Sequence, residues 1–267
     1  LFIVTDSVTD PVNVTKLFAA GCVSLGVFSI VLAYGLKELW NTSKSLVVFS
    51  ALFVLAGLNA VINSDAPATQ NLYGVFGRQT GFVTYLLLTL VALSATLLRV
   101  QKSFDRLIWA LLFSGAVNVV YCGWALAFGD FIHWNNPYGN ILGLFGNPDF
   151  ISAFLGMFIA GTIGYAFSSK HSWLYRGGFV LLSVVALYEI KRSHAIQGLV
   201  VTAAGLAIVG FYFVRGKTKG SLFTSLYVVA VGTLGGFALA GALQRGPLVS
   251  LIYKTSVSLR GQYWKAG

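Results

Sequence analysis

The sequence is short of charged residues, cysteine and proline, and each shortage excludes something. Charged residues make up 10% of the 267 residues, whereas a soluble domain carries about 25%, so a soluble globular fold is excluded. The two cysteines, Cys22 and Cys122, both lie in apolar runs. They give no support for a disulfide framework or a Cys-x-x-Cys metal site. The five prolines lie outside the long apolar runs, which fits unkinked helices joined by loops.

Long uncharged apolar runs occupy most of the chain. A membrane-spanning helix needs about 20 mostly apolar residues, and eight stretches reach or approach that length. They lie near residues 15–36, 45–64, 79–99, 107–129, 149–169, 173–190, 193–214 and 220–244. The sequence therefore predicts an all-α, polytopic membrane helical bundle of about eight transmembrane helices in residues 1–246. Residues 247–267 are expected to begin an extracytoplasmic segment with an interfacial amphipathic helix.

The loop charges predict how the bundle is oriented. The loops after the first, third, fifth and seventh spans hold ten Lys and Arg residues, against four in the opposite set and four in the C-terminal tail. The positive-inside rule places the first set in the cytoplasm. The other face carries all five prolines, six of the eight acids and the longest loops, 65–78 and 130–149, so we expect the chemistry there. The net charge of +10 then reflects topology, and no nucleic-acid partner is expected.

Two motifs on the expected outer face have a structural and a functional interpretation. Arg78 lies among glycines that let the backbone approach a ligand or a helix, but an arginine that snorkels to lipid headgroups explains it as well. Asn147 suits a helix N-cap, followed by Pro148 and Asp149. The plain interpretation is a helix start. The functional one is an anionic group held by the free N–H groups, which Asp149 would weaken unless it is paired.

The densest polar segment lies between two apolar runs and contains Glu189, Lys191, Arg192, His194 and Gln197. Such charge density at a membrane boundary is costly and often functional. Arg192 and His194 could hold a phosphate and move a proton. The alternative is an ordinary solvated loop.

The C-terminal tail offers one more basic candidate. Arg260 lies in the segment SVSLRGQYW. It either faces the same site as Arg192 or belongs to an interfacial anchor.

Four motifs together resemble the O-antigen ligase and O-antigen polymerase superfamily, which are multi-span bacterial membrane enzymes. In chain order they are a Gly-Arg-x-x-Gly loop, Phe-Gly-Asn-Pro opening a helix, a short basic loop before a helix, and Ser-Leu-Arg-x-x-x-Trp-x-Ala. The resemblance runs from about Gly74 to Gly267. It implies metal-independent transfer of a glycan from undecaprenyl diphosphate to an acceptor hydroxyl, at the periplasmic face of the bacterial inner membrane and without a cofactor. The acceptor, whether a lipid, a growing glycan or a protein, is left open.

The resemblance also implies roles for individual residues. Arg260 matches the family's arginine ahead of a tryptophan, and Arg192 stands at the other essential basic position, so both are expected to be catalytic. Arg78, Asn147, His194 and Gln197 are expected to bind substrate. Many members have Ser-Arg-Gly where this chain has Ala195 to Gly198, so either Arg192 or Gln197 fills that position. The family's histidine base lies in a later periplasmic loop, so we expect this chain to be a fragment that lacks its start and that loop.

The sequence also allows a different class of function. A secondary transporter or a lipid-linked glycan flippase would place polar residues near the membrane midplane, often in broken helices. The middles of the eight runs hold no formal charge, which favours the enzyme. The absence of any Asp-x-Asp motif excludes the metal–carboxylate clamp of soluble nucleotide-sugar transferases and favours a lipid-linked donor. A structural membrane scaffold is a third possibility.

Overall fold

A computed structural model describes residues 13–75, 79–132, 136, 139–168, 172–218, 221–243 and 245–249. Within these ranges the regular elements are helices, and no strand occurs. Six helices there are long and apolar enough to cross a membrane, the first of them running from residue 13 to 62. The protein is an all-α, polytopic membrane helical bundle, as the sequence predicts. The chain divides into two compact units, Leu1–Trp109 and Ala110–Gly267, which are taken separately below.

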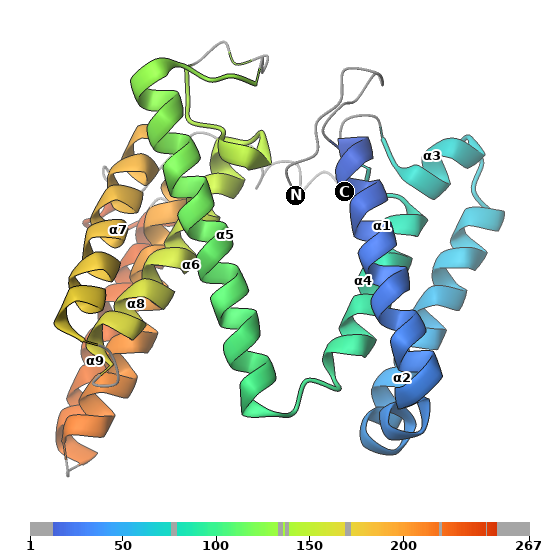
Figure 1. Cartoon of the computed structure of the whole chain (residues 1–267), viewed down its shortest axis with the longest axis horizontal. Coiled ribbons are helices and arrows are strands. Elements are labelled where there is room, and N and C mark those ends of the chain that lie inside the picture. The colour runs from blue at the N-terminus through green and yellow to red at the C-terminus, as the bar shows by residue number, and fades with distance from the viewer. Residues whose placement is uncertain are drawn as a thin grey trace. The chain divides into compact units, whose positions relative to one another are not determined.

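The first unit is built around a helical hairpin. Its elements are α1 (Asn13–Ile30), the short π-helix η1 (Val31–Gly35), α2 (Leu36–Ile62), α3 (Ala68–Tyr73) and α4 (Phe82–Ala95). The chain reverses direction between α1 and the later part of α2 (Figure 1), and Ser43, inside α2, departs from helical geometry, with φ −131° and ψ 34°. The expected break between the first two spans is thus a distorted helical stretch without proline. Helix α4 packs on both α1 and α2.

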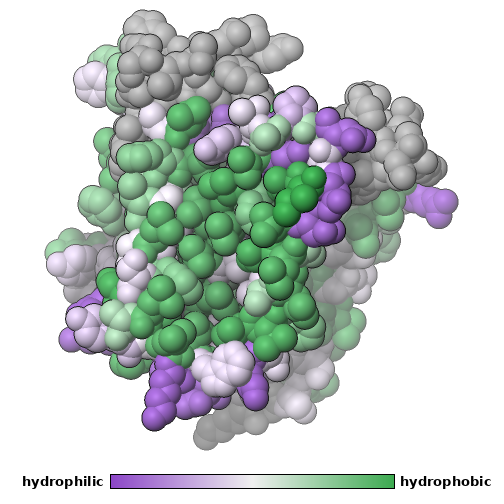
Figure 2. All heavy atoms as spheres, turned by 90° about the vertical axis from the view of Figure 1, so that its right-hand side faces the viewer, coloured by the Kyte–Doolittle hydropathy of each residue, from purple (hydrophilic) through white to green (hydrophobic). Residues whose placement is uncertain are grey.

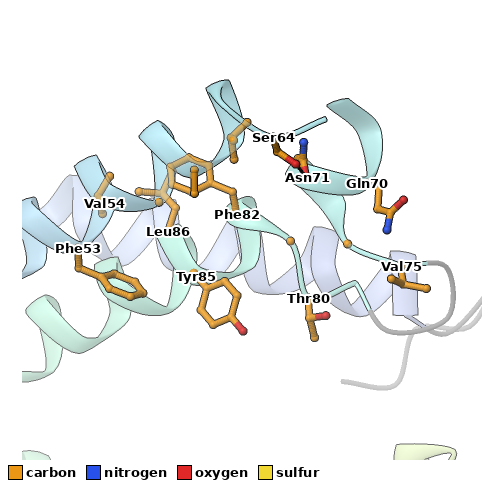
Figure 3. Close-up of a pocket in the computed structure, with 15 residues that line it drawn as sticks. Phe53, Val54, Ser64, Gln70, Asn71, Val75, Thr80, Phe82, Tyr85 and Leu86 are labelled. Carbon is orange, nitrogen blue, oxygen red and sulfur yellow. Dashed lines mark hydrogen bonds between the residues drawn. The ribbon is translucent and has the colours of Figure 1, made fainter. Parts of the chain in front are cut away.

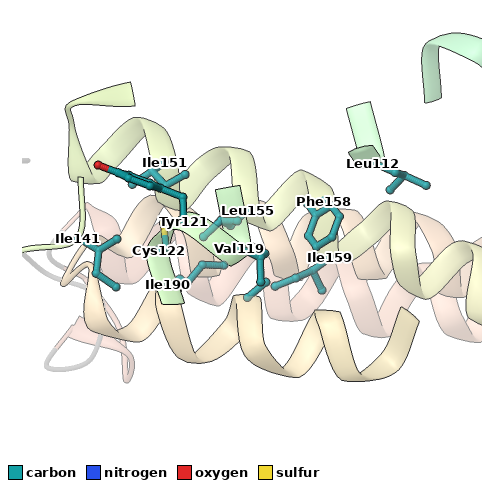
Figure 4. Packing of buried hydrophobic residues seen from close by; sticks show 11 residues of the cluster. Leu112, Val119, Tyr121, Cys122, Ile141, Ile151, Leu155, Phe158, Ile159 and Ile190 are labelled. Carbon is teal, nitrogen blue, oxygen red and sulfur yellow. The ribbon is translucent and has the colours of Figure 1, made fainter. Parts of the chain in front are cut away.

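The second unit contains most of the buried core. Its elements are α5 (Gln101–Phe128, which begins in the first unit), the 3-10 turn η2 (Gly143–Phe145), α6 (Pro148–Phe167), α7 (Trp173–Arg192), α8 (Ile196–Lys217) and α9 (Ser221–Ala242). Side chains from α5, α6 and α7 form one apolar cluster (Figure 4). Phe158 of α6 is 1% exposed and packs directly on Gly115 of α5. Helix α6 is therefore the central helix of this unit.

Helices α6 and α8 run parallel and in close contact. A Cβ atom on Gly198 would lie 2.6 Å from the Ser152 carbonyl oxygen, and one on Gly205 would lie 2.5 Å from Cβ of Ala160. The contact between Ser152 and Gly198 comes before the contact between Ala160 and Gly205 along both helices. The N-termini of α6 and α8 therefore lie at the same end. Lipid provides no hydrophobic force between helices, so small residues that let backbones approach are the usual basis of such packing.

Helix α7 runs antiparallel beside α6 and adds a polar contact. The hydroxyl groups of Thr162 and Ser183 lie 2.8 Å apart in the buried interface. Hydrogen bonds of this kind also hold membrane helices together. The bounds of α7 and α8 leave only residues 193–195 between them. Lys191 and Arg192 therefore belong to a helix, and Ser193 to Ala195, expected at the head of the next span, form the turn.

The outer surface of the first unit is apolar. Large hydrophobic side chains of α2 are exposed along its length, among them Phe49, Leu52, Leu55 and Ile62. The face that carries α2 and α3 is mostly hydrophobic, with hydrophilic residues gathered toward its upper and lower edges (Figure 2). Exposed apolar area of this extent marks a membrane contact, so this face contacts membrane lipid.

Candidate functional site

Three helix ends of the second unit meet around Gly198. This glycine of α8 is buried, and a Cβ atom there would lie 2.8 Å from Cβ of Ser152 on α6 and 2.7 Å from Cγ2 of Ile190 on α7. The first turns of α6 and α8 and the last turn of α7 are thereby brought together. We call this group of helix ends, with the residues that begin or end them, the junction.

The first turn of α6 at the junction is capped by Asn147. Its side-chain oxygen accepts hydrogen bonds from the backbone N–H groups of Asp149, at 2.9 Å, and Phe150, at 3.4 Å. Pro148 occupies the first helical position. The plain interpretation of this motif, a capped helix start, is therefore confirmed. The side-chain oxygen of Asn147 is already used within the protein.

The turn from α7 to α8 depends on an unusual backbone conformation at His194. Its φ of 58° lies in the left-handed region, where glycine or asparagine usually follows a helix C-terminus. A non-glycine residue there costs about 1–2 kcal/mol. The preceding Ser193 is buried, and its hydroxyl accepts from the backbone N–H of Ala195 at 3.3 Å. The imidazole itself is exposed.

The junction holds four of the six residues that the sequence singled out. Arg192 is exposed in the last turn of α7, where Lys191 is its neighbour. Gln197 is half-buried in the first turn of α8, directly before Gly198. Asn147 and His194 complete the four. Arg78 and Arg260 lie outside the described residues.

The junction carries charge of both signs. Helix N-termini carry partial positive charge, and their first N–H groups lack helical partners, but at α6 Pro148 has no N–H and Asn147 already accepts from Asp149 and Phe150. Here the N-termini of α6 and α8 lie side by side, next to the cationic Lys191 and Arg192. Asp149 in the first turn of α6, the buried Glu189 and the negative end of the α7 dipole oppose this charge. In the described part of the chain, no group of three or more His, Cys, Asp or Glu residues is placed to hold a metal ion.

Glu189 lies one turn before Arg192 and is buried. The residue is 1% exposed, and neither carboxylate oxygen has a hydrogen-bond partner among the described residues. A Cβ atom on Gly123 of α5 would lie 3.7 Å from Oε1. One interpretation of the sequence was that Glu189 lies in an ordinary solvated loop. The structure instead places it in the interior between helices.

The loop between α5 and α6 is fastened to α5 by polar contacts that sequence reasoning missed. The Tyr121 hydroxyl donates to Asp130, whose carboxylate also accepts from the backbone N–H of Ile132 at 2.9 Å. The buried Asn118 accepts from the backbone N–H of Leu144 at 3.3 Å. These contacts hold the loop that leads to Asn147. A polar residue such as Asn118 inside an apolar run was the available signal.

The paired Gly74 and Gly81 in the first unit explain the glycines around Arg78. Gly74 has a φ of 92°, and a Cβ atom there would lie 2.6 Å from the backbone nitrogen of Gly81. Two segments of backbone are thus in contact at the base of the loop that these glycines enclose. In the described residues this close approach is between backbone near Gly74 and near Gly81, and an approach to a ligand at Arg78 stays a prediction.

Comparisons with protein-family models, with curated proteins and with solved structures find no match.

Proposed function

We propose that this multi-pass membrane protein transfers a glycan from undecaprenyl diphosphate to an acceptor hydroxyl at the periplasmic face of the bacterial inner membrane, in the manner of O-antigen ligases and polymerases. The observation that supports the proposal is the junction, where the N-terminus of α8 lies beside Lys191 and Arg192 at the end of α7. Helix N-termini and guanidinium groups both bind phosphate oxygens. The order of the four sequence motifs supports the same reaction.

The proposed reaction needs an anion site and a proton carrier. A bond forms between the acceptor oxygen and the anomeric carbon of the glycan, while the bond from that carbon to the diphosphate oxygen breaks. Undecaprenyl diphosphate leaves with the electron pair, and Arg192 stabilises the charge that accumulates on it. The proton of the acceptor hydroxyl passes to a base. In the family that the motifs resemble, this base is a histidine of a later periplasmic loop, and His194 is the proton carrier that the junction itself offers.

A transfer assay tests the proposal. Membranes that contain the full-length protein are mixed with a glycan linked to undecaprenyl diphosphate and with candidate acceptors. We expect a glycosylated acceptor and free undecaprenyl diphosphate in equal amounts, without added metal. Release of glycan into solution alone, or no product with any lipid, glycan or protein acceptor, would contradict the proposal.

His194 provides a prediction that separates function from stability. Glycine relieves the strain of the left-handed backbone but removes the imidazole, so His194→Gly is expected to lower transfer while the melting temperature stays the same or rises. Transfer in membranes and thermal unfolding in detergent measure the two effects. His194→Asn, which also suits this backbone, is the control for loss of the ring. Undiminished transfer in both variants would show that His194 only forms the turn.

The buried Glu189 favours a second candidate, an ion-coupled transporter. An ionisable group inside a membrane helix is costly, and such groups often bind the transported ion or proton. Under this alternative, Glu189 is essential for uptake of a solute into vesicles.

The variant Glu189→Gln distinguishes the two candidates. Glutamine keeps the shape of the side chain, and burial of a neutral amide costs less than burial of a charge. We expect unchanged glycan transfer and an unchanged or higher melting temperature. Glu38→Gln, at an exposed carboxylate paired with Arg99 at 2.9 Å, is the matched control. Loss of ion-coupled solute uptake in Glu189→Gln, together with no transfer by the wild type, would favour the transporter.

A further inference from the structure

The first unit contains a groove that the proposed transfer reaction does not use. It has a volume of about 430 Å³ and lies between α2, α3 and α4, which is within the usual size range of ligand sites, about 300–1,000 Å³. Gly57 and Phe82 both line the groove. They lie against each other, since a Cβ atom on Gly57 would be 3.0 Å from the Phe82 ring. Phe53 and Tyr85 form its wall, with ring centroids 6.3 Å apart.

The two ends of the groove differ in chemistry. At one end lie Phe53 and Val54, with Phe82 and Leu86 farther along, whereas Gln70 lies at the other end (Figure 3). Such a groove matches a molecule that has a hydrocarbon chain and a polar head.

The polar end has free hydrogen-bonding groups. Asn71 is used within the protein, since its side chain donates to the Ala66 carbonyl at 3.0 Å and accepts from Ser64 at 3.2 Å. The exposed side chains of Gln70 and Thr80, in contrast, have no hydrogen-bond partner among the described residues. Both can donate to an oxygen of a ligand.

The length of the groove corresponds to one leaflet of a bilayer. Between Phe53 and Ile62, where α2 ends, the helix rises by about 13.5 Å, and half of the hydrocarbon core is about 15 Å thick. The polar end lies where α2 leaves its apolar run, and the apolar end lies near the middle of that run. A chain in the groove would therefore run from the headgroup region to the midplane.

We infer that this groove is a binding site for one phospholipid, with an acyl chain along α2 and α4 and the phosphate near Gln70 and Thr80. The phospholipid is the lipid that forms the leaflet, and its chain and head have the dimensions and polarity of the groove. The site is independent of the glycan-transfer reaction.

Photolabelling tests the inference. The full chain is reconstituted in vesicles of phosphatidylglycerol and phosphatidylcholine that contain a trace of phosphatidylglycerol with a diazirine near the middle of one acyl chain. Labelled peptides are mapped by mass spectrometry. We expect label concentrated on the groove positions of α2 and α4 rather than spread evenly over the exposed apolar residues of α2, and competition by unlabelled phosphatidylglycerol.

Two variants and one control complete the test. Ala60→Phe fills the groove and is expected to lose most of the groove label, whereas Ala51→Phe, an equal change at an exposed position of α2 outside the groove, keeps it. Gln70→Leu, which leaves the groove open, is expected to weaken the label. Even labelling of all faces, equal labelling in Ala60→Phe and Ala51→Phe, or competition by undecaprenyl phosphate alone would overturn the inference.

Discussion

Gly198→Leu is expected to destroy the packing of the second unit and to lower the free energy of unfolding by about 3 kcal/mol or more. The glycine lies in a close contact between α6 and α8, where a Cβ atom would be 2.6 Å from the Ser152 carbonyl oxygen, and it also faces α7, where Cγ2 of Ile190 would be 2.7 Å away. The carbonyl oxygen belongs to a helix backbone and cannot move away cheaply. Thermal unfolding in detergent, followed by circular dichroism, measures the change.

The matched control lies on the same helix. A Cβ atom on Gly216 would have no other atom within 4 Å. Gly216→Leu therefore makes an identical substitution in open space near the end of α8. Its melting temperature should stay close to that of the wild type. Equal melting temperatures for Gly198→Leu and Gly216→Leu would show that α6 and α8 are not packed as described.

Arg192→Ala should reduce glycan transfer by about tenfold to a hundredfold, because a hydrogen bond to a charged group contributes roughly 1.5–3 kcal/mol. Arg192→Lys keeps the charge but loses the planar pair of donors that fits a phosphate, so it should also impair transfer. Arg215→Ala is the control, since it removes an exposed arginine from the last turn of α8, at the other end of that helix from the junction. It should leave transfer nearly unchanged.

The measurement is initial transfer rate in membranes, corrected for the amount of each variant. We expect Arg260→Ala to behave like Arg192→Ala if both arginines hold one diphosphate, although Arg260 lies outside the described residues. Equal activity of Arg192→Ala and Arg215→Ala would contradict a role of Arg192 in holding the diphosphate. Loss of protein from the membrane, in contrast, would indicate a role in folding.

Much of the fold is predictable from local sequence. Each residue in an apolar run contributes its own transfer free energy to lipid, so the sum over about 20 residues identifies a span without any knowledge of its neighbours. The start of α6 is equally local, because Asn147 bonds to N–H groups two and three residues ahead. The all-α membrane class and this capped helix start follow from such short-range interactions.

The form of the break between the first two spans was harder to predict than its position, which the expected spans 15–36 and 45–64 leave at residues 37–44. The sequence has no proline there, and the departure from helical geometry occurs at Ser43. Similarly, α7 continues through Arg192 because charged residues in a last helical turn are compatible with the helix dipole. Hydropathy alone ends a span at the first charges and cannot detect this continuation.

The sequence by itself determined that this chain crosses a membrane as apolar helices and that its basic residues gather at helix ends. Only the tertiary structure decided that α6 and α8 pack in parallel through Gly198, that Glu189 is buried, and that a groove forms between α2 and α4. A helix that is apolar on all sides has no amphipathic face to indicate its partner. In lipid, the choice of partner depends on close contacts between small residues and on a few hydrogen bonds, and these exist only once segments distant in sequence meet.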